Sequence, residues 1–293
     1  LNLPGFLNFD NSANTKAIIF SKVLKVIFHL GLSRFFRSGS FRVHSRYGKG
    51  LLFWISKQAY SQFSIFTGTV GPNRKAIIEL SQMGRTRAFI KYALSKQSEE
   101  LIQNQISTLR WLKTCKLHTI QIPELITSHK HQAVLENIKP EGITSSAKFS
   151  EVHFKALFEL FTSSMHTNTV KETDYWNQIE TQIQQITNDD AVPYSKNILK
   201  NLKRLSGLIQ TDAKVILSRS HGDFTPWNMY PQGERLFLYD WELSQAAVPV
   251  FHDLFHYIFQ SEILLFHSDF LKIQASIDGI IEKPYSQRLI EFY

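Results

Sequence analysis

The sequence predicts an α+β fold, in which a small antiparallel sheet with one helix precedes a mostly helical body. Short apolar runs separated by polar, glycine-containing turns occur before residue 138 and are typical of strands. Beyond Gly142 the strand patterns stop and apolar residues recur at helical spacing. The chain has 293 residues, 43% of them apolar, and is therefore long enough to bury the core of one large or two small domains.

Three strands are expected to begin the sheet. The first apolar run lies in SQFSIF (61–66), the second covers residues 75–80, and the third is RAFIKYA (87–93). The segment SQMGRT before the third run is typical of a hairpin turn, because glycine adopts the backbone angles that tight turns require. The pattern therefore predicts antiparallel pairing.

A helix is expected after the third strand. Ser98 is a suitable N-cap for it, with Glu99 and Glu100 in the first turn. The apolar residues at helical spacing are Leu101, Ile102, Ile106, Leu109 and Leu112. A second hairpin is expected next, with strands near residues 124–128 and 133–138.

The helical body is expected to begin after a link that contains Lys139, Pro140 and Gly142. Three segments in it have apolar residues at helical spacing. They are residues 149–162, 173–186 and 195–209. The sequence contains no internal repeat and no low-complexity segment. It is predicted to divide into three regions. These are a basic, aromatic-rich and helical extension (1–60), an N-terminal lobe (61–138) and a helical C-terminal lobe (139–293).

The charge and the cysteine content restrict the class of protein. Residues 1–140 contain 20 Lys and Arg against 6 Asp and Glu, whereas residues 141–293 contain 13 against 19. The two halves are therefore expected to face different partners, or different parts of one ligand. The single cysteine, Cys115, excludes an intramolecular disulfide and a thiolate zinc cluster and favours a reducing compartment. We predict a cytoplasmic protein, with the inner membrane surface as the alternative.

The most apolar part of the extension is residues 17–37. Lys22, Lys25 and Arg34 interrupt it, so it is typical neither of a secretory signal nor of a transmembrane span. A helix would gather Lys22, Lys25 and His29 on one face. Two interpretations stay open: a helix packed on the body of the protein, and a basic interfacial helix in peripheral contact with anionic lipid.

Two features of the predicted sheet suit a bound phosphate. Gly68 and Gly71 lie between the first two strands, where the missing Cβ atoms let backbone N–H groups approach a phosphate closely. Lys91 lies in an otherwise apolar strand, so its ammonium group must either reach solvent or meet an anion. An ordinary hairpin and an edge-strand lysine are the alternative interpretations.

Three polar residues follow apolar runs within residues 218–242, a segment that also indicates two short strands and two tight loops. Asp223 and Asn228 share one loop, and Asp240 ends the run RLFLYD. Two carboxylates and an amide oxygen suit Mg²⁺ bound together with substrate phosphates. One carboxylate can instead accept a proton from an attacking hydroxyl. Turn or cap roles for each aspartate do not explain why the three residues occur together.

The segments HGDFTPWN (221–228) and LYDWE (238–242) resemble the catalytic and metal-binding signature of the aminoglycoside phosphotransferase and choline kinase superfamily, relatives of the protein kinases. The order of GTVGPNRK, FIKY and VPVFHDLFH is similar as well, so the resemblance covers about residues 62–260. It implies a protein-kinase-like, two-lobed fold. It also implies an ATP-dependent phosphotransferase that moves the γ-phosphate to a hydroxyl of a sugar, amino alcohol or aminoglycoside-like molecule.

The resemblance assigns roles to individual residues. Asp223 would be the catalytic carboxylate that takes the proton of the acceptor hydroxyl. Asn228 and Asp240 would hold Mg²⁺ on the nucleotide phosphates, and Lys91 would contact the α- and β-phosphates. The backbone N–H groups of the glycine loop would cover the β- and γ-phosphates, through Gly68, Thr69, Val70 and Gly71.

Other residues would shape or support the site. Residues 135–138 would form the hinge, where backbone groups of Glu136 and Ile138 face adenine. His221 would support the loop rather than act as a base, and Asp253 would brace it. Two tryptophans are expected to pack beside the site, with an aromatic wall for the acceptor as the alternative: Trp227 and Trp241.

One position departs from the family pattern. Members usually carry a glutamate on the helix after the strand lysine, and the best match here is Gln105. An amide can hydrogen-bond to Lys91 but cannot neutralise it. The ion pair of Lys91 is therefore expected to be weaker, or to be supplied by Glu99 or Glu100.

Two functions stay open at this stage. A small-molecule kinase that uses ATP and Mg²⁺ is favoured, because Asp223, Asn228 and Asp240 are all present. A kinase-like nucleotide-binding module with little or no turnover is the alternative, and only Gln105 supports it. Nucleic acid is not an expected partner, since nothing but the basic charge of the N-terminal part favours it.

Overall fold

The computed structural model describes residues 60, 62–67, 71–143, 145–188 and 196–292, and positions 23, 26, 27 and 30 of the extension. Residues 23, 26 and 27 are helical, and the Leu30 N–H donates to the Val26 carbonyl (2.9 Å). The rest of the predicted extension lies outside the described residues. So do three residues of the predicted glycine loop, Gly68, Thr69 and Val70.

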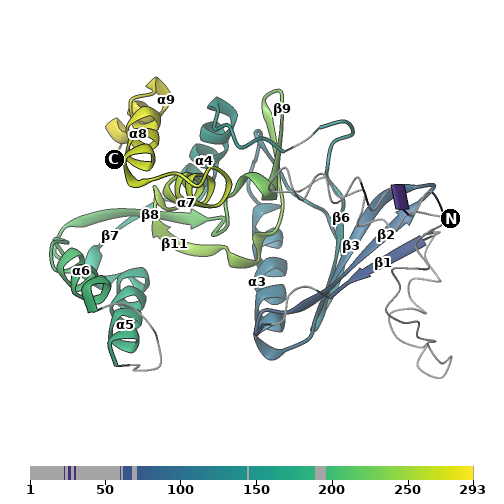
Figure 1. The fold of residues 1–293 in the computed structure, drawn as a ribbon, viewed down its shortest axis with the longest axis horizontal. Coiled ribbons are helices and arrows are strands. Elements are labelled where there is room, and N and C mark those ends of the chain that lie inside the picture. Colours follow the sequence, from purple (N-terminus) through teal and green to yellow (C-terminus); the bar gives the residue numbers. More distant parts are fainter. Residues whose placement is uncertain are drawn as a thin grey trace.

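A five-stranded antiparallel sheet forms one end of the molecule (Figure 1). In spatial order its strands are β1 (Gln62–Phe66), β2 (Lys75–Gln82), β3 (Arg85–Ala93), β6 (Gln132–Glu136) and β5 (Leu125–His129). Lys91 of β3 lies opposite Ile77 of β2 and Ala133 of β6. Because β3 is the central strand, Lys91 is not an edge-strand lysine.

Helix α3 (Lys96–Leu112) follows β3 and begins earlier than the sequence pattern predicted. Its N-cap is Ser95, so the prediction of Ser98 as the cap is wrong. Ser98 is the third helical residue: its N–H donates to Ser95 Oγ (3.1 Å), and its Oγ accepts from the Ser95 N–H (2.9 Å). This reciprocal capping places a polar serine inside the first turn, which hides the true start.

The C-terminal part is mainly helical. Its helices are α4 (Glu151–Ser164), α5 (Asp174–Asn188), α6 (Lys196–Ser206), α7 (His252–Gln260), α8 (Phe270–Ile281) and α9 (Pro284–Phe292). Helix α7 continues into one π-helical turn (Ser261–Leu265). Figure 1 shows α5 and α6 at the end of the molecule away from the sheet, with α3 between them and the sheet. No helix in the described part of the chain is long and apolar enough to span a bilayer.

The expectation that strands stop beyond Gly142 is wrong outside residues 218–242, the segment in which two short strands were predicted and in which β9 (Met229–Gln232) and β10 (Arg235–Leu238) lie. One further sheet has the order β11 (Gln245–Pro249), β8 (Lys214–Ser220) and β7 (His166–Thr169). A second contains β4 (Ile120–Gln121), β10 and β9. Most of these strands are short, and β7 has the sequence HTNT, which contains no apolar residue to make a pattern. The predicted α+β class is confirmed.

The main core joins the two parts of the chain. The apolar face of α3 packs against apolar residues that lie next to the loops of residues 218–242. These buried residues include Ile102, Ile106 and Leu109 of α3, and Phe224, Leu238 and Trp241. The helix therefore connects the sheet to the two loops that carry Asp223 and Asp240.

A buried histidine at the start of α4 makes the stability sensitive to pH. The Ser150 N–H donates to Nδ1 of His153 (3.1 Å), and burial lowers the pKa of His153 from 6.5 to about 4. Below pH 6.5 the unfolded chain binds a proton that the folded chain does not bind. We therefore expect this residue to cost up to about 3 kcal/mol of unfolding free energy as the pH falls towards 4.

Denaturant unfolding between pH 7 and pH 4 can test this expectation, with His153→Phe as the matched variant. Other groups titrate in both proteins, so the difference between the two unfolding free energies isolates His153. The parent should lose more stability than the variant. A difference that stays constant over this range would contradict the prediction.

Candidate functional site

A cavity of about 420 Å³ lies between the five-stranded sheet and the C-terminal part. Most of its wall area is apolar, although half of the lining residues are polar or charged, and sites for small molecules combine apolar walls and polar groups in this way. Phe66 and Phe89 of the sheet line it from one side, and Tyr230 and Tyr239 from the other. Five of the predicted site residues line it as well: Lys91, Gln105, Glu136, Ile138 and Asp240.

Asn137 holds the predicted hinge in place. Its N–H donates to the Arg87 carbonyl (2.9 Å), and its side-chain nitrogen donates to the Thr86 carbonyl (3.1 Å). Both acceptors belong to β3. These bonds fasten the chain between Glu136 and Ile138 to the sheet, so that both residues lie at the wall of the cavity.

The loop after β8 is braced by a buried carboxylate. Asp253 of α7 accepts from the backbone N–H groups of His221 (2.6 Å) and Gly222 (3.0 Å). Burial alone would raise the pKa of Asp253, but hydrogen bonds and the neighbouring histidines lower it, so the carboxylate stays ionised. Asp253 thus fixes the backbone immediately before Asp223.

His221 connects the two loops of the site. Its Nε2 donates to the Tyr239 carbonyl (3.0 Å), and its Nδ1 accepts from the Asp223 N–H (3.2 Å). Burial lowers the pKa of His221 although nearby carboxylates oppose this, so the imidazole is neutral. With both nitrogens bonded to backbone groups, His221 supports the loop.

Asp223 and Asn228 face each other across one short loop. The side-chain nitrogen of Asn228 donates to Asp223 Oδ2 (2.7 Å) and to the Asp223 carbonyl (3.1 Å). The Asn228 carbonyl accepts from the Tyr239 N–H (3.1 Å), which ties this loop to the residue before Asp240. Because the amide nitrogen makes the bonds to Asp223, the amide oxygen is the atom that can bind a cation.

Gly222 allows the two loops to touch through their backbones. Its φ is +83°, and a Cβ atom added there would lie 2.0 Å from the Leu243 carbonyl oxygen. Asp240 also has a left-handed backbone (φ 68°, ψ 56°), which aspartate adopts more readily than most residues. Glycine is therefore required at position 222, both for its backbone angles and for the close contact.

Four charged side chains meet between the sheet and the Asp240 loop. Lys91 forms ion pairs with Asp240 and with Glu242 (Nζ to Oε2, 3.2 Å), and Lys75 also pairs with Glu242. Burial alone would raise the pKa of Asp240, but the charges of Lys91 and Lys75 lower it to about 2. The two carboxylates likewise raise the pKa of Lys91 against the effect of burial. Lys91 and Asp240 are therefore both ionised at neutral pH.

Lys91 was expected to have a weaker ion pair or one supplied by Glu99 or Glu100, and the second of these alternatives is wrong. Glu242 supplies the charge that Gln105 lacks. Gln105 itself is fully buried, and its side-chain amide has no hydrogen-bond partner among the described residues. Glu99 instead pairs with two residues of the β5–β6 turn, Lys130 and His131. Glu242 lies in the LYDWE segment, 151 positions after Lys91, and no local sequence pattern indicates a contact between residues so far apart.

For the ATP-dependent enzyme that the sequence resemblance implies, we predict that Glu242→Gln raises the Michaelis constant for ATP roughly tenfold, since Lys91 would keep only one of its two charged partners. Gln105→Glu would add a third carboxylate beside a lysine that is already paired, so it should not lower this constant. Steady-state kinetics with varied ATP check both changes, with Glu100→Gln as an exposed control on α3. An unchanged constant in Glu242→Gln would contradict the assignment.

His256 is a site residue that the sequence pattern did not identify. Its Nε2 lies 3.2 Å from Asp223 Oδ1, and its ring stacks on that of His252 (centroids 6.3 Å apart, planes 8° apart). His256 follows Asp253 by three positions on α7, so both residues lie on the same face of the helix. This spacing within VPVFHDLFH was a signal that could have found it.

The remaining predicted residues have simpler surroundings. Trp241 is fully buried, and its Nε1 donates to the Leu238 carbonyl (3.1 Å), so it is not an aromatic wall for an acceptor. Trp227 is half-buried.

Gly71 is exposed, and its carbonyl accepts from the Arg74 N–H (3.1 Å). A Cβ atom at Gly71 would contact nothing within 4 Å.

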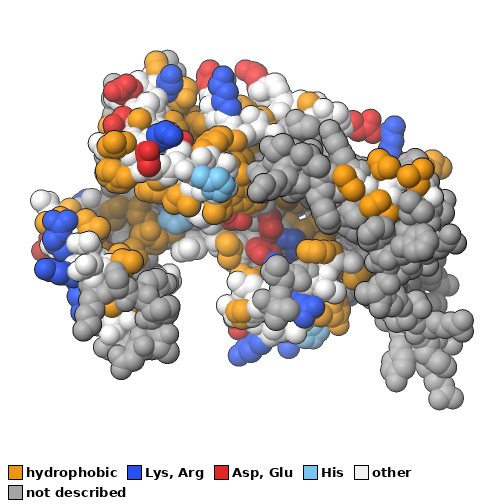
Figure 2. Space-filling model, viewed as in Figure 1, with side chains coloured by type: hydrophobic (Ala, Val, Ile, Leu, Met, Phe, Trp, Pro, Cys, Tyr) orange, Lys and Arg blue, Asp and Glu red, His pale blue; other side chains and the backbone are white. Residues whose placement is uncertain are grey.

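Figure 2 shows the surface hollowed between the part that carries α5 and α6 and the part that carries α3. Tyr175 of α5 meets His252 of α7 edge-on (centroids 6.0 Å apart). The first turn of α5 therefore contacts the first residue of α7, the helix whose His256 contacts Asp223.

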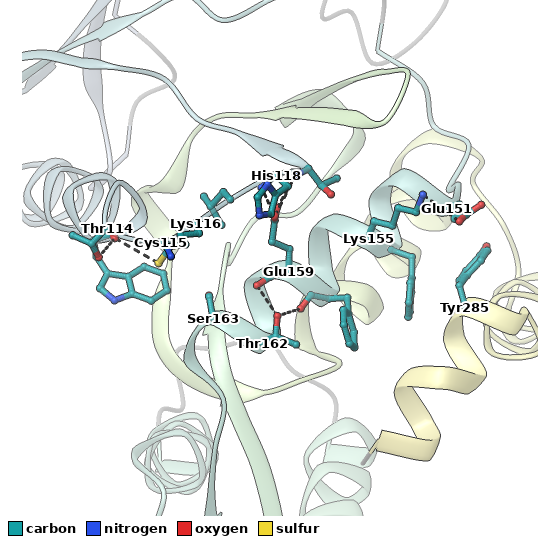
Figure 3. Close-up of a pocket in the computed structure, with 15 residues that line it drawn as sticks. Thr114, Cys115, Lys116, His118, Glu151, Lys155, Glu159, Thr162, Ser163 and Tyr285 are labelled. Carbon is teal, nitrogen blue, oxygen red and sulfur yellow. Dashed lines mark hydrogen bonds and ion pairs between the residues drawn. The ribbon is translucent and has the colours of Figure 1, made fainter.

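A larger cavity of about 800 Å³ lies beside α4, and none of the predicted site residues lines it (Figure 3). Glu159 points from α4 towards the chain after α3 and accepts from the N–H groups of Thr119 (3.0 Å) and Ile120 (2.8 Å). Its carboxylate is thus used to fix that chain segment. Burial raises the pKa of the Cys115 thiol there, which lowers the reactivity of this cysteine.

Comparison with known proteins gives structural relatives only. No family model and no curated protein matches the chain. Macrolide 2′-phosphotransferase type I superposes with a TM-score of 0.53 at 13% identity, over 80% of this chain and 82% of that chain. The streptomycin–ATP ternary complex of APH(2″)-IIa gives 0.51 at 14% identity, over 74% and 76%. ADP-bound aminoglycoside phosphotransferase APH(2″)-Ib gives 0.50 at 16% identity, over 82% and 93%.

Proposed function

The chain has the kinase-like fold of the aminoglycoside phosphotransferase and choline kinase superfamily, and from this premise we propose an ATP-dependent phosphotransferase that acts on a hydroxyl of a small molecule. One observation carries the proposal. Asp223 and Asn228 are hydrogen-bonded to each other in one loop. In the next loop, Asp240 forms an ion pair with Lys91 of the sheet. A general base, metal ligands and a phosphate-binding lysine are what phosphoryl transfer requires.

The 420 Å³ cavity is the proposed nucleotide site. Adenine would lie between its aromatic walls, next to the backbone of Glu136 and Ile138. Lys91 would contact the α- and β-phosphates, and the N–H groups from Gly68 to Gly71 would cover the terminal phosphates. APH(2″)-IIa was solved with ATP and APH(2″)-Ib with ADP, which supports the choice of ligand for this chain.

Asn228 and Asp240 are the proposed ligands of Mg²⁺. The donor set fits this ion, because one carboxylate and one amide oxygen leave room for oxygen atoms of the phosphates. The low pKa of Asp240 and its ion pair with Lys91 support this choice, because they keep the carboxylate ionised and therefore able to bind a cation. When bound, the ion would neutralise charge on the phosphates.

Asp223 is the proposed base. Its carboxylate would accept the proton of the acceptor hydroxyl as the hydroxyl oxygen attacks the γ-phosphorus and the bond to the bridging oxygen of ADP breaks. Asp253 and His221 hold the loop backbone around it, so that Asp223 keeps its place during the reaction.

The acceptor is proposed to be a sugar-like or other small alcohol. The side of Asp223 that faces α7 carries His256 and His252, with Tyr175 beyond them. A polycationic aminoglycoside would be attracted to a part of the protein that is rich in carboxylates. Residues 141–293 contain 19 acidic and 13 basic residues, a net charge of only −6, which does not favour such an acceptor. Membrane contact through residues 17–37 stays a prediction.

Turnover of Mg-ATP against a panel of sugars, amino alcohols, choline and aminoglycosides tests the proposed function. ADP formation that depends on one class of acceptor, and that is absent in Asp223→Asn, is the expected result. Mg²⁺-dependent ATP binding without transfer to any member would favour the alternative, a nucleotide-binding module. The observation that Glu242 replaces the missing charge partner of Lys91 argues against that alternative.

A further inference from the structure

We propose that His256 is a positioning residue that holds the carboxylate of Asp223 in the orientation needed to receive the proton of the acceptor. The inference rests on the proposed function, because it gives His256 a part in the same reaction. It concerns a residue that neither phosphate binding nor metal binding explains.

Both oxygens of Asp223 are engaged by side chains. Asn228 donates to Oδ2 (2.7 Å), and Nε2 of His256 lies 3.2 Å from Oδ1. The torsion that rotates a carboxylate about its Cβ–Cγ bond is broad, so one hydrogen bond leaves the plane of the group poorly defined. Two partners on different oxygens define that plane. Without His256, only Asn228 would restrain it.

One face of α7 supports both the backbone and the side chain of the catalytic loop. Asp253 accepts from the backbone N–H groups of His221 and Gly222, and His256, one turn later, reaches the side chain of Asp223. Residues three apart on a helix point in similar directions. Helix α7 therefore sets the position of the loop and the orientation of its carboxylate together.

The chemistry of the contact defines the tautomer. A carboxylate oxygen accepts a hydrogen bond, so Nε2 of His256 must carry the hydrogen. The ring of His252 stacks almost parallel to that of His256, and Nδ1 of His252 lies 3.4 Å from Asp253 Oδ1. The His256 ring thus has its Nε2 edge towards Asp223 and one face towards the ring of His252.

The pair also lies where an acceptor must arrive. The side chains of His256 and Asp223 are 26% and 30% exposed, whereas Asp253 is only 4% exposed. A carboxylate oxygen has two lone pairs, so a donor from His256 leaves room for an acceptor hydroxyl on the same group. His256 can therefore orient Asp223 without blocking it.

Two variants of His256 separate its hydrogen bond from its volume. His256→Phe keeps an aromatic ring but removes the donor, whereas His256→Gln places an amide N–H near the position of Nε2. We expect His256→Phe to lower kcat roughly 10- to 100-fold, the scale found for residues that orient the ligands of a metal ion through hydrogen bonds. His256→Gln should recover most of this loss, and the Michaelis constant for ATP should stay unchanged in both. His166→Gln, an exposed histidine on β7, is the control.

These rates are measured with the acceptor found in the panel or, before one is known, as Mg-ATP hydrolysis with water as the acceptor. Equal kcat values in the parent and His256→Phe would overturn the proposal. Equal losses in His256→Phe and His256→Gln would also overturn it, because they would show that the ring and not its donor matters.

Imidazole ¹H–¹⁵N spectra of the full chain test the contact without any turnover. The signal that disappears in His256→Gln should show a protonated Nε2, and it should shift in Asp223→Ala but not in Asp212→Ala, a remote exposed aspartate. An Nδ1-protonated ring, or a signal indifferent to Asp223→Ala, would overturn the proposal. A parent that binds Mg-ATP but transfers no phosphate would refute the proposed function alone, and these spectra would then decide whether His256 holds Asp223.

Discussion

Asp223→Asn is expected to lower the rate of phosphate transfer by roughly 10²- to 10⁴-fold, the usual contribution of a positioned general base. An amide cannot accept the proton of the acceptor, and its NH₂ group would oppose the donor of either Asn228 or His256. Nucleotide affinity should stay nearly intact, because Asp223 does not line the cavity that contains Lys91 and Asp240.

Single-turnover kinetics and ATP titration by calorimetry measure the two quantities separately. Asp212→Asn is the matched control, because Asp212 is an exposed aspartate that pairs only with Lys171 in the described part of the chain. A parental rate in Asp223→Asn would remove this residue from the mechanism. A loss of ATP binding equal to the loss of rate would mean that it supports the nucleotide site instead.

Asp240→Ala is expected to abolish Mg²⁺-dependent ATP binding and to act more severely than Asn228→Ala. It removes a full negative charge beside a dication, whereas Asn228→Ala removes only a neutral oxygen ligand. It also takes one of two charged partners from Lys91, which keeps Glu242. The effect on ATP binding should therefore be much larger with Mg²⁺ present than without it.

The backbone at position 240 calls for a second variant. Alanine tolerates a left-handed conformation less well than aspartate or asparagine, so Asp240→Ala combines the loss of charge with backbone strain. Asp240→Asn keeps the tolerant side chain and removes only the charge. Calorimetry with and without Mg²⁺ should find both variants defective. If either variant kept the parental dependence on Mg²⁺, the metal assignment would be wrong.

The sequence indicated the candidate site residues best where these residues lie close together along the chain. The loop from His221 to Asn228 and the LYDWE segment contain most of the polar groups of the site, and helical or strand periodicity defined most of the elements around them. Lys91 was also identified, because a charge within an apolar strand is unusual.

Contacts between distant residues were not predictable in the same way. Glu242 pairs with Lys91 over 151 positions, and no local pattern separates this partner from the nearer Glu99 and Glu100. The spacing of three positions places His256 on the same face of α7 as Asp253, but its contact with Asp223 also depends on how α7 packs beside the loop. Strand β7 consists of four polar residues, and its pairing with β8 alone makes it a strand.

The contact between Gly222 and the Leu243 carbonyl has a consequence for directed evolution of this protein. Here two backbones meet without a side chain between them, so no compensating substitution elsewhere can make room for a larger residue at position 222. A mutant library that varies this position would consist mainly of poorly folded members. The exposed residues of α5 have no such restriction, so a library can vary them while the two loops are left unchanged.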